Sequence, residues 1–421
     1  MSDITLAYGH DTVRFAFDED RYQVLIPPAR TETPLSDVEI GLALDSPMGT
    51  TKLEEILSPG ESVLIVVSDA TRATASAQIV NLLVRRVIQM GISMADIAII
   101  FATGIHRPVT TSEKQELLTP FIFQRIRTID HSASDAGGLL RLGITERGSP
   151  VEVNRALLDF SRVIVTGAVG FHYFAGFTGG RKSVCPGLAS APTIEATHML
   201  ALDFQRGGRR AGVGTGLLDG NAVNEECERI AGLINPAFTI NTVVDERGRA
   251  VRVYAGHWRE SHRAACVEYL AEHSATIGER RDVVIASCGG RPSDINLIQA
   301  HKTLDMAARA CKRGGTIILL AECGEGLGRH DFLKWFTEQD SGALEKRLGH
   351  SYEVNGQTAW SLLTKAEQFR VVLVSQLDPE DVKLMRMEPA SSLTEAMAAV
   401  ASDAAGLILP RGAALLPLPA A

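Results

Sequence analysis

The stretch His172–Lys182 reads HYFAGFTGGRK and closely follows the apolar run Val163-Ile164-Val165. It places a histidine, glycine-framed turns and an Arg-Lys pair where the chain leaves a buried strand. In α/β proteins the loop after the carboxyl end of a strand is where reactive groups are exposed. A second histidine, His198, comes sixteen residues after the lysine. This arrangement predicts an α/β fold with a functional loop after residue 165.

Glycine is frequent in and just after this stretch, at positions 176, 179, 180 and 187. Glycine accepts positive φ and lets the backbone approach a ligand closely, so a flat or phosphorylated group could lie against the main chain. Lys182 is a candidate for covalent attachment, since a lysine amine that loses solvation becomes nucleophilic and can form an amide, imine or thioamide link. The ordinary alternative is a solvated Arg-Lys pair, because short glycine motifs have many false positives.

Apolar runs alternate with amphipathic segments along the chain, an order typical of α/β layers. The first half predicts strands near 62–68, 96–101, 125–130 and 161–167, and helices near 76–90 and 111–118. Strands at 238–244 and 250–255, a helix at 257–277 and a linker at 278–281 follow. Further on we expect strands at 282–287, 316–320 and 370–375, helices at 294–313 and 391–402, and a loosely packed tail from 409. The pattern predicts two α/β domains, 1–275 and 276–421, with an active-site cleft between them.

Other predicted strand ends also carry polar side chains, in SDATR at 68–72 and GIHRPVT at 104–110. Arg72 suits a carboxylate ligand, because a guanidinium fork pairs two oxygens at once. Asp69, in the same segment, could cap the helix predicted at 76–90. In DINLIQAHK (294–302), Gln299 and Lys302 are three residues apart and would share one helix face, although an ordinary surface helix is the alternative.

Together these segments resemble the nickel-pincer lactate racemase family. The resemblance implies that Lys182 covalently carries a nickel pincer nucleotide, pyridinium-3,5-bisthiocarboxylic acid mononucleotide. It implies that His198 is the fourth nickel ligand, and that Asp69 and Gln299 bind the cofactor. Square-planar nickel with sulfur donors and an imidazole agrees with the preferences of this metal.

The resemblance also implies the reaction, the racemisation of a 2-hydroxy acid by hydride transfer to the cofactor. His106 and His172 would be the two acid/base histidines, one for each face of the substrate, as a racemase requires. Arg72 and Lys302 would bind the substrate. His131-Ser132 departs from the family pattern, where an acidic residue follows the histidine, so we expect His131 to support a neighbouring group at most.

Composition limits the remaining classes of function. A net charge of −8, with no basic face, argues against a nucleic-acid partner. The six cysteines contain no Cys-x-x-Cys pair, which indicates neither a zinc knuckle nor a disulfide framework. We find no signal peptide and no apolar stretch of membrane-spanning length, and so expect a cytoplasmic protein without a membrane partner. Its expected partners are a small-molecule 2-hydroxy acid and the cofactor-maturation enzymes.

Two other classes of function stay open at this point. One is a zinc or magnesium hydrolase that uses His106, His131, His172 and His198, although none of them lies in a His-x-x-x-His arrangement. The other is a cofactor-binding or sensor protein without turnover. Lactate and malate are equally supported as substrates. Ile298, beside Gln299, is a candidate contact of the third carbon, while the arginines at 206, 209 and 210 could recognise a second acidic group or a cofactor phosphate.

Overall fold

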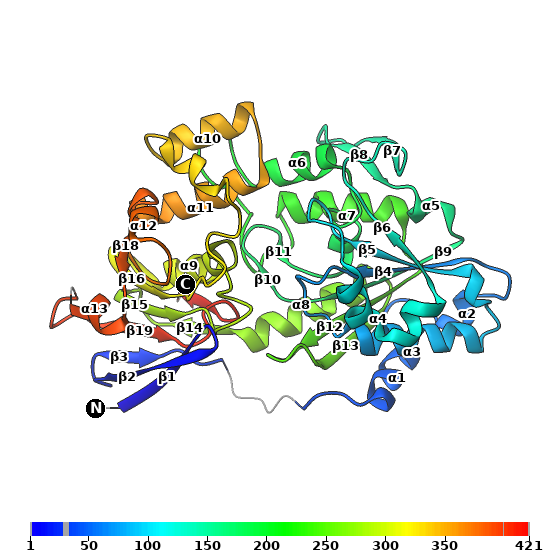
Figure 1. Ribbon diagram of the computed structural model, residues 1–421, viewed down its shortest axis with the longest axis horizontal. Coiled ribbons are helices and arrows are strands. Elements are labelled where there is room, and N and C mark those ends of the chain that lie inside the picture. Colours follow the sequence, from blue (N-terminus) through cyan, green and yellow to red (C-terminus); the bar gives the residue numbers. More distant parts are fainter. Residues whose placement is uncertain (1, 28–32, 399, 420–421) are drawn as a thin grey trace. The chain divides into compact units, whose positions relative to one another are not determined.

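The computed structural model describes residues 2–27, 33–398 and 400–419, and Figure 1 labels its helices and strands. The chain divides into two compact units. Unit 1 contains the described residues up to 27, residues 202–209 and those from 270 onward. Unit 2 contains residues 33–201 and 210–269. The start of the chain belongs to unit 1 because its third strand pairs with a strand near residue 406.

Unit 2 is built on a six-stranded sheet in the order β13-β12-β9-β4-β5-β6. All neighbouring strands are parallel except β13, which runs antiparallel to β12. The central strands are continuous runs of buried apolar residues, as expected of a parallel sheet covered on both faces. The strands are β4 (Val63–Ser68), β5 (Ile97–Ala102), β6 (Arg127–Asp130), β9 (Arg162–Ala168), β12 (Phe238–Val244) and β13 (Ala250–Gly256).

The strand order of this sheet reverses between β4 and β9. From β4 the chain adds β5 and β6 on one side, and β9 is then placed on the other side of β4. In open α/β sheets, ligands bind at such a switch point, outside the carboxyl ends of the strands. The loops that leave β4 and β9 are the SDATR segment and the HYFAGFTGGRK segment.

Helices and short hairpins complete unit 2. Helix α3 contacts α4, and both pack on the core of the sheet (Figure 1). The helices are α1 (Asp37–Asp45), α2 (Leu53–Ile56), α3 (Ser76–Gln89), α4 (Thr111–Arg125), α5 (Ala156–Asp159), α6 (Ala191–Met199), α7 (Ala222–Ile234) and α8 (Glu260–His273), whose end enters unit 1. The hairpins pair β7 (Leu139–Ile144) with β8 (Pro150–Asn154) and β10 (Phe171–His172) with β11 (Gly176–Phe177).

Unit 1 has a parallel sheet in the order β18-β17-β16-β15-β19-β3. Its strands are β3 (Tyr22–Val24), β15 (Arg281–Ser287), β16 (Cys311–Leu320), β17 (Arg370–Val374), β18 (Glu388–Ala390) and β19 (Gly406–Leu409). Its helices are α9 (Leu297–Ala310), α10 (Ser341–His350), α11 (Val354–Gln368), α12 (Pro379–Leu384) and α13 (Leu393–Ala398). Two further strand pairs are β1 (Ser2–Tyr8) with β2 (Asp11–Phe17), and β14 (Ser274–Ile277) with β20 (Leu416–Pro419).

The structure confirms the alternating α/β order and corrects three boundaries. The helix predicted at 257–277 ends at His273, and the next four residues form β14. The helix predicted at 294–313 ends at Ala310, since β16 begins at Cys311. The prediction of a loose tail from 409 is wrong: Leu416 is buried and β20 pairs with β14. Within the described residues, no helix is long and apolar enough to traverse a bilayer.

Candidate active site

Asp69 and His106 form a hydrogen-bonded pair at the carboxyl edge of the unit 2 sheet. They follow the neighbouring parallel strands β4 and β5, whose last residues, Ser68 and Ala102, are in register. His106 Nδ1 lies 2.6 Å from Asp69 Oδ2, and because a carboxylate only accepts, the ring nitrogen donates. Asp69 is 4% exposed, whereas the His106 side chain is 47% exposed. The carboxylate therefore orients a histidine that solvent can reach.

The other oxygen of Asp69 is held locally. It accepts hydrogen bonds from the backbone N–H of Thr71 at 2.9 Å and from the Thr71 hydroxyl at 2.5 Å. Burial alone would raise the pKa of Asp69, but the hydrogen bond and charge of His106, with Thr71 and Arg72, lower it below its usual value. Asp69 does not cap the following helix, since the N-cap of α3 is Ala75 and has no side-chain hydrogen bond.

His172 ends the first strand of the β10–β11 hairpin, opposite Gly176. Its Nδ1 accepts a hydrogen bond from the backbone N–H of Ala175 at 3.2 Å and a longer one from Phe174 at 3.5 Å. An accepting Nδ1 carries no proton, so the proton of the neutral ring is on Nε2. The hairpin thus fixes the tautomer of His172.

The glycines of this loop are required by close packing. Gly176 has a φ of +79°, and a Cβ there would lie 2.0 Å from the carbonyl oxygen of Leu217. At Gly180, the backbone N–H donates to Asn241 Oδ1 on β12 at 2.8 Å. Asn221, the N-cap of α7, donates to the carbonyl of Phe174 at 2.8 Å. These contacts press the loop onto β12 and α7 rather than leaving it open to solvent.

The Arg181-Lys182 pair is not solvated, so that alternative is wrong. Arg181 is 2% exposed, and Lys182 is partly buried. The pKa of Lys182 is lowered to about 7, first by burial and then by the positive charges of Arg181 and Arg72. In the described part of the chain Lys182 has no carboxylate partner, and its ammonium group lies 5.5 Å from the ring centroid of Phe174. A lysine in these surroundings is a nucleophilic amine near neutral pH.

His198 lies in the last turn of α6 and is 7% exposed. Its Nδ1 is 2.7 Å from the carbonyl oxygen of Ile194, one turn earlier, so Nδ1 donates and the lone pair is on Nε2. Burial, together with the charge of Lys182, lowers the pKa of His198 to about 3, which keeps the ring neutral. A neutral imidazole whose other nitrogen donates to a carbonyl is the usual arrangement of a metal-ligating histidine.

Phe174 contacts all of these groups, and nothing in HYFAGFTGGRK singles it out as a site residue. Its ring centroid lies 4.5 Å from the ring of His172 and 5.0 Å from that of His198, edge to face in both cases. The amine of Lys182 also packs on it. The structure therefore brings His172, Lys182 and His198 together around one aromatic side chain.

Arg72 follows the carboxyl end of β4, at the same edge of the sheet, and is exposed. Its backbone N–H donates to the carbonyl of Asp69 at 3.2 Å, and its charge acts on both Asp69 and Lys182. The loop after β5 approaches the lysine loop as well, because Gly104 N–H donates to Gly187 O at 2.8 Å. Six of the predicted site residues thus lie in unit 2: Asp69, Arg72, His106, His172, Lys182 and His198.

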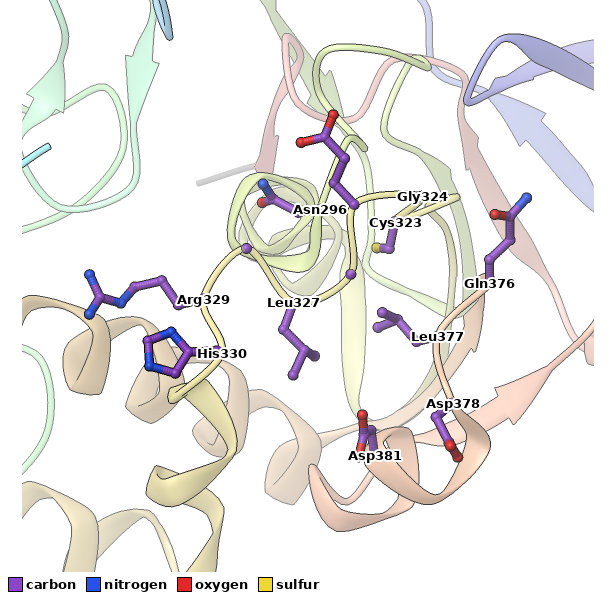
Figure 2. Close-up of a pocket in the computed structure, with 13 residues that line it drawn as sticks. Asn296, Cys323, Gly324, Leu327, Arg329, His330, Gln376, Leu377, Asp378 and Asp381 are labelled. Carbon is purple, nitrogen blue, oxygen red and sulfur yellow. The ribbon is translucent and has the colours of Figure 1, made fainter. Parts of the chain in front are cut away.

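Gln299 and Lys302 belong to unit 1, in the first turns of α9. Lys302 Nζ donates to Gln299 Oε1 at 2.5 Å, so the prediction that they share a helix face is confirmed. A cavity of about 800 Å³ opens beside the same helix and is lined by its N-cap Asn296 and the glycine-rich loop 323–330 (Figure 2). None of the predicted site residues lines this cavity.

His131 and Arg209, two further residues considered in the sequence, are held by hydrogen bonds or an ion pair within the fold. His131 is 2% exposed; its Nε2 donates to Ala189 O at 3.1 Å, and its Nδ1 accepts from Asn154 at 3.2 Å. His131 is therefore a core histidine. Arg209 pairs with buried Asp305 at 3.1 Å. Among the residues that the structure describes, no three His, Cys, Asp or Glu side chains gather as a metal-binding group.

Sequence reasoning also missed Asn241 and His262, which contact Gly180 and Arg181 in the loop that carries Lys182. Asn241 is a fully buried amide in the strand FTINTVV, and an amide in a buried strand was a usable signal, because it needs a hydrogen-bond partner. His262 contacts Arg181 from α8, eighty-one residues away in the chain, and nothing local in its sequence indicates that contact.

Comparison with known proteins agrees with this fold and site. The profiles of the lactate racemase N-terminal and C-terminal domains match residues 8–208 and 277–415. Lactate racemases of Lactiplantibacillus plantarum and Thermoanaerobacterium thermosaccharolyticum are 31% and 29% identical over 406 residues, 94% of each chain. The solved lactate racemase apoprotein from T. thermosaccharolyticum is 27% identical, with a TM-score of 0.91 over 99% of this chain and 100% of that one. A solved Thermotoga maritima protein, 19% identical, shares the fold with a TM-score of 0.69 over 93% of this chain and 100% of that one.

These matches define a two-domain α/β protein of the kind found among racemases. The chain belongs to the lactate racemase family, with both of the domains that the family profiles describe. The predicted family and the two-domain α/β fold are thereby confirmed.

Proposed function

We propose that this protein is a nickel-pincer-dependent racemase or epimerase of a small 2-hydroxy acid. The observation that carries the proposal is the pairing of Lys182 with His198 around Phe174. A covalently bound nucleotide needs a nucleophilic amine, and a metal held by that nucleotide needs a neutral imidazole nearby. Lys182 and His198 have these two properties.

The residues present fit the nickel pincer nucleotide. Among the described residues, Lys182 has no carboxylate partner that covalent attachment would have to displace. The hydrogen bond from Nδ1 of His198 to the Ile194 carbonyl leaves the lone pair on Nε2, where a metal could be bound. The glycines at 179 and 180 serve packing against Asn241 and His262, so the fit rests on Lys182 and His198. We propose that Asp69 and Gln299 help to hold the cofactor, as the family resemblance implies.

When bound, this group would supply an acceptor for the hydride on the substrate α-carbon. The protein's own contribution is then to move the hydroxyl proton and to orient the acid. His106, oriented by Asp69 through Nδ1, would exchange that proton at Nε2 on one face. His172, with Nδ1 occupied by the Ala175 N–H, would do the same at Nε2 on the other face.

Arg72 would bind the substrate carboxylate, with Lys302 as the second cation. An exposed guanidinium is well suited to this role, because its planar fork can pair both oxygens of a carboxylate at once. The named relatives are lactate racemases, which makes lactate the first substrate to test. Malate follows, although Arg209 is already bound to Asp305.

We also propose which partners the protein needs and in which compartment it works. Cofactor-maturation enzymes would be required partners, since a covalently held nickel nucleotide must be made before it is attached. We place the protein in the cytoplasm, where its six cysteines would stay reduced; all six are free and buried.

The test is racemisation in D₂O by protein co-produced with the maturation enzymes. Each enantiomer of lactate and of malate is incubated separately and analysed by chiral chromatography and mass spectrometry. Hydride transfer predicts racemised product that retains hydrogen on the α-carbon. Deuterium at the α-carbon would show proton abstraction instead, and bound cofactor without racemisation of any 2-hydroxy acid would identify a binding or sensor protein.

A further inference from the structure

Arg181 is a buried cation in the loop that carries Lys182. It is 2% exposed, and no carboxylate lies within ion-pair distance of it in the residues that the structure describes. The acidic groups that act on its charge are the thiols of Cys266 and Cys227 and then the carboxylate of Glu228, which is itself bound by Arg259 and Arg263. Burying an unpaired guanidinium is unfavourable, so its retention beside the cofactor lysine calls for a function.

The hydrogen bonds of Arg181 go to the main chain of the loop in which it lies. Nη2 donates to Ala175 O at 2.9 Å, and Nη1 has longer contacts of 3.4 Å with the carbonyls of Thr178 and Gly179. Nη1 also lies 2.9 Å from Nε2 of His262. The guanidinium Nε is buried and has no hydrogen-bond partner in the part of the chain that the structure describes. Arg181 therefore contacts three carbonyls of its own loop, and the shortest of these contacts is with Ala175.

Ala175 links this arrangement to His172. Its carbonyl accepts from Arg181, while its N–H donates to Nδ1 of His172 at 3.2 Å. A rigid planar fork fixes the direction of the carbonyl that it binds more strictly than an ammonium does. The peptide plane that follows Ala175 is thereby held, and with it the residue whose N–H occupies Nδ1.

We infer that Arg181 is a positioning residue: through Ala175 it holds the imidazole of His172 in the tautomer with the proton on Nε2, the nitrogen that exchanges the substrate hydroxyl proton. This inference rests on the proposed function for the role of His172, whereas the tautomer itself is a property of the protein alone. Arg181 touches neither substrate nor cofactor in this account.

The experiment uses ¹⁵N-histidine NMR of the full-length protein without cofactor. The signals of His172, one of eleven histidines, are assigned by their loss in His172→Gln. At pH 8 the wild type should show His172 with protonated Nε2 and unprotonated Nδ1. Arg181→Gln should give a mixture of both tautomers, and guanidinium ion in the millimolar range should restore the wild-type signal. Arg155→Gln, which removes an exposed arginine of the same unit, should leave it unchanged.

A second readout is kinetic. In the cofactor-loaded enzyme Arg181→Gln should lower kcat about 10- to 100-fold through misplacement of His172, with KM altered less than about 3-fold and nickel content unchanged. Arg181→Lys keeps the charge without the planar fork. Its fraction of the Nε2-protonated tautomer and its kcat should lie between those of the wild type and Arg181→Gln.

The outcomes separate this inference from the proposed function. If Arg181→Gln does not fold, Arg181→Lys decides. An unchanged tautomer in the folded variant, or failure of both variants to fold, would reduce Arg181 to a structural residue and overturn the inference. Neither result would touch the cofactor or the racemisation. Conversely, a protein without nickel or racemase activity would overturn the proposed function and leave the tautomer result standing.

Discussion

Lys182 illustrates how single residues in this protein acquire chemistry from their surroundings. A lysine in water has a pKa of about 10.4 and is an ammonium ion at neutral pH. In the folded protein, burial and the adjacent charges of Arg181 and Arg72 lower the pKa of Lys182 to about 7. Half of these side chains would thus be free amines under physiological conditions, without any general base.

This gives a pH prediction for the protein without cofactor. Below the lowered pKa the amine is protonated and unreactive, so the rate of acetylation of Lys182 by acetic anhydride should rise through a midpoint near pH 7. Peptide mass spectrometry against pH measures it, with Lys52, an exposed lysine of the same unit, as internal reference. A midpoint near that of an ordinary lysine would refute the environment described for Lys182.

Asp69 gives a second prediction at this scale. Asp69→Asn keeps the shape of the side chain, but its amide can donate to His106 Nδ1 and so favour the wrong tautomer. We expect kcat to fall about 100-fold or more, as when a general base loses its orientation. Because Asp69 is also proposed to help hold the cofactor, nickel content is measured in the same samples and kcat is expressed per loaded enzyme; the exposed Asp159→Asn serves as control. A variant with the wild-type kcat would remove the Asp69–His106 pair from catalysis.

At the scale of elements, the β10–β11 hairpin depends on a backbone that only glycine adopts readily. Gly176→Ala would combine positive φ with a Cβ 2.0 Å from the Leu217 carbonyl, a rigid backbone atom. We predict a loss of about 2 kcal/mol or more in the free energy of unfolding, measured by urea denaturation. Gly41→Ala in α1, where a Cβ meets no atom within 4 Å, should be neutral or stabilising by about 1 kcal/mol. Equal effects at the two positions would contradict the packing described.

Elements differ in how far the sequence predicts them. The strand Val63–Ser68 could be predicted because a continuous apolar run bounded by polar residues has few alternatives in an α/β chain. The tail could not: LPLP at 416–419 has two prolines, which lack an N–H, and reads as a loop. It is a strand because β14 pairs with it, a contact across some 140 residues.

The same distinction applies to the site. The loops that carry Asp69, His106 and Lys182 could be located, since each follows a recognisable strand. The 2.6 Å contact between Asp69 and His106 could not be predicted, because it depends on β4 and β5 being neighbours in register. The contact of Arg181 with His262 depends likewise on where α8 packs.

At the scale of the whole molecule, the chain forms two units, and the sequence runs from one to the other more than once. Strand β20 illustrates this, because it lies near the end of the chain and pairs with β14 some 140 residues earlier within unit 1. Truncation after residue 414 would expose Ile277 and remove the buried Leu415 and Leu416. We predict a loss of about 3 kcal/mol or more in the free energy of unfolding, with new protease cleavage near 274–277. Pro419→Ala, at an exposed position, is the control; a truncated protein as stable as this control would contradict the role of β20.

The central claim concerns the whole functional assembly: a racemase whose nickel cofactor is attached to Lys182 and ligated by His198. Its most direct test is intact-mass and nickel analysis of protein produced together with the maturation enzymes. We predict one covalent adduct and bound nickel in the wild type, no adduct in Lys182→Ala, and an adduct with much reduced nickel in His198→Ala. An unmodified, nickel-free wild type despite active maturation enzymes, or an adduct that survives in Lys182→Ala, would contradict the account.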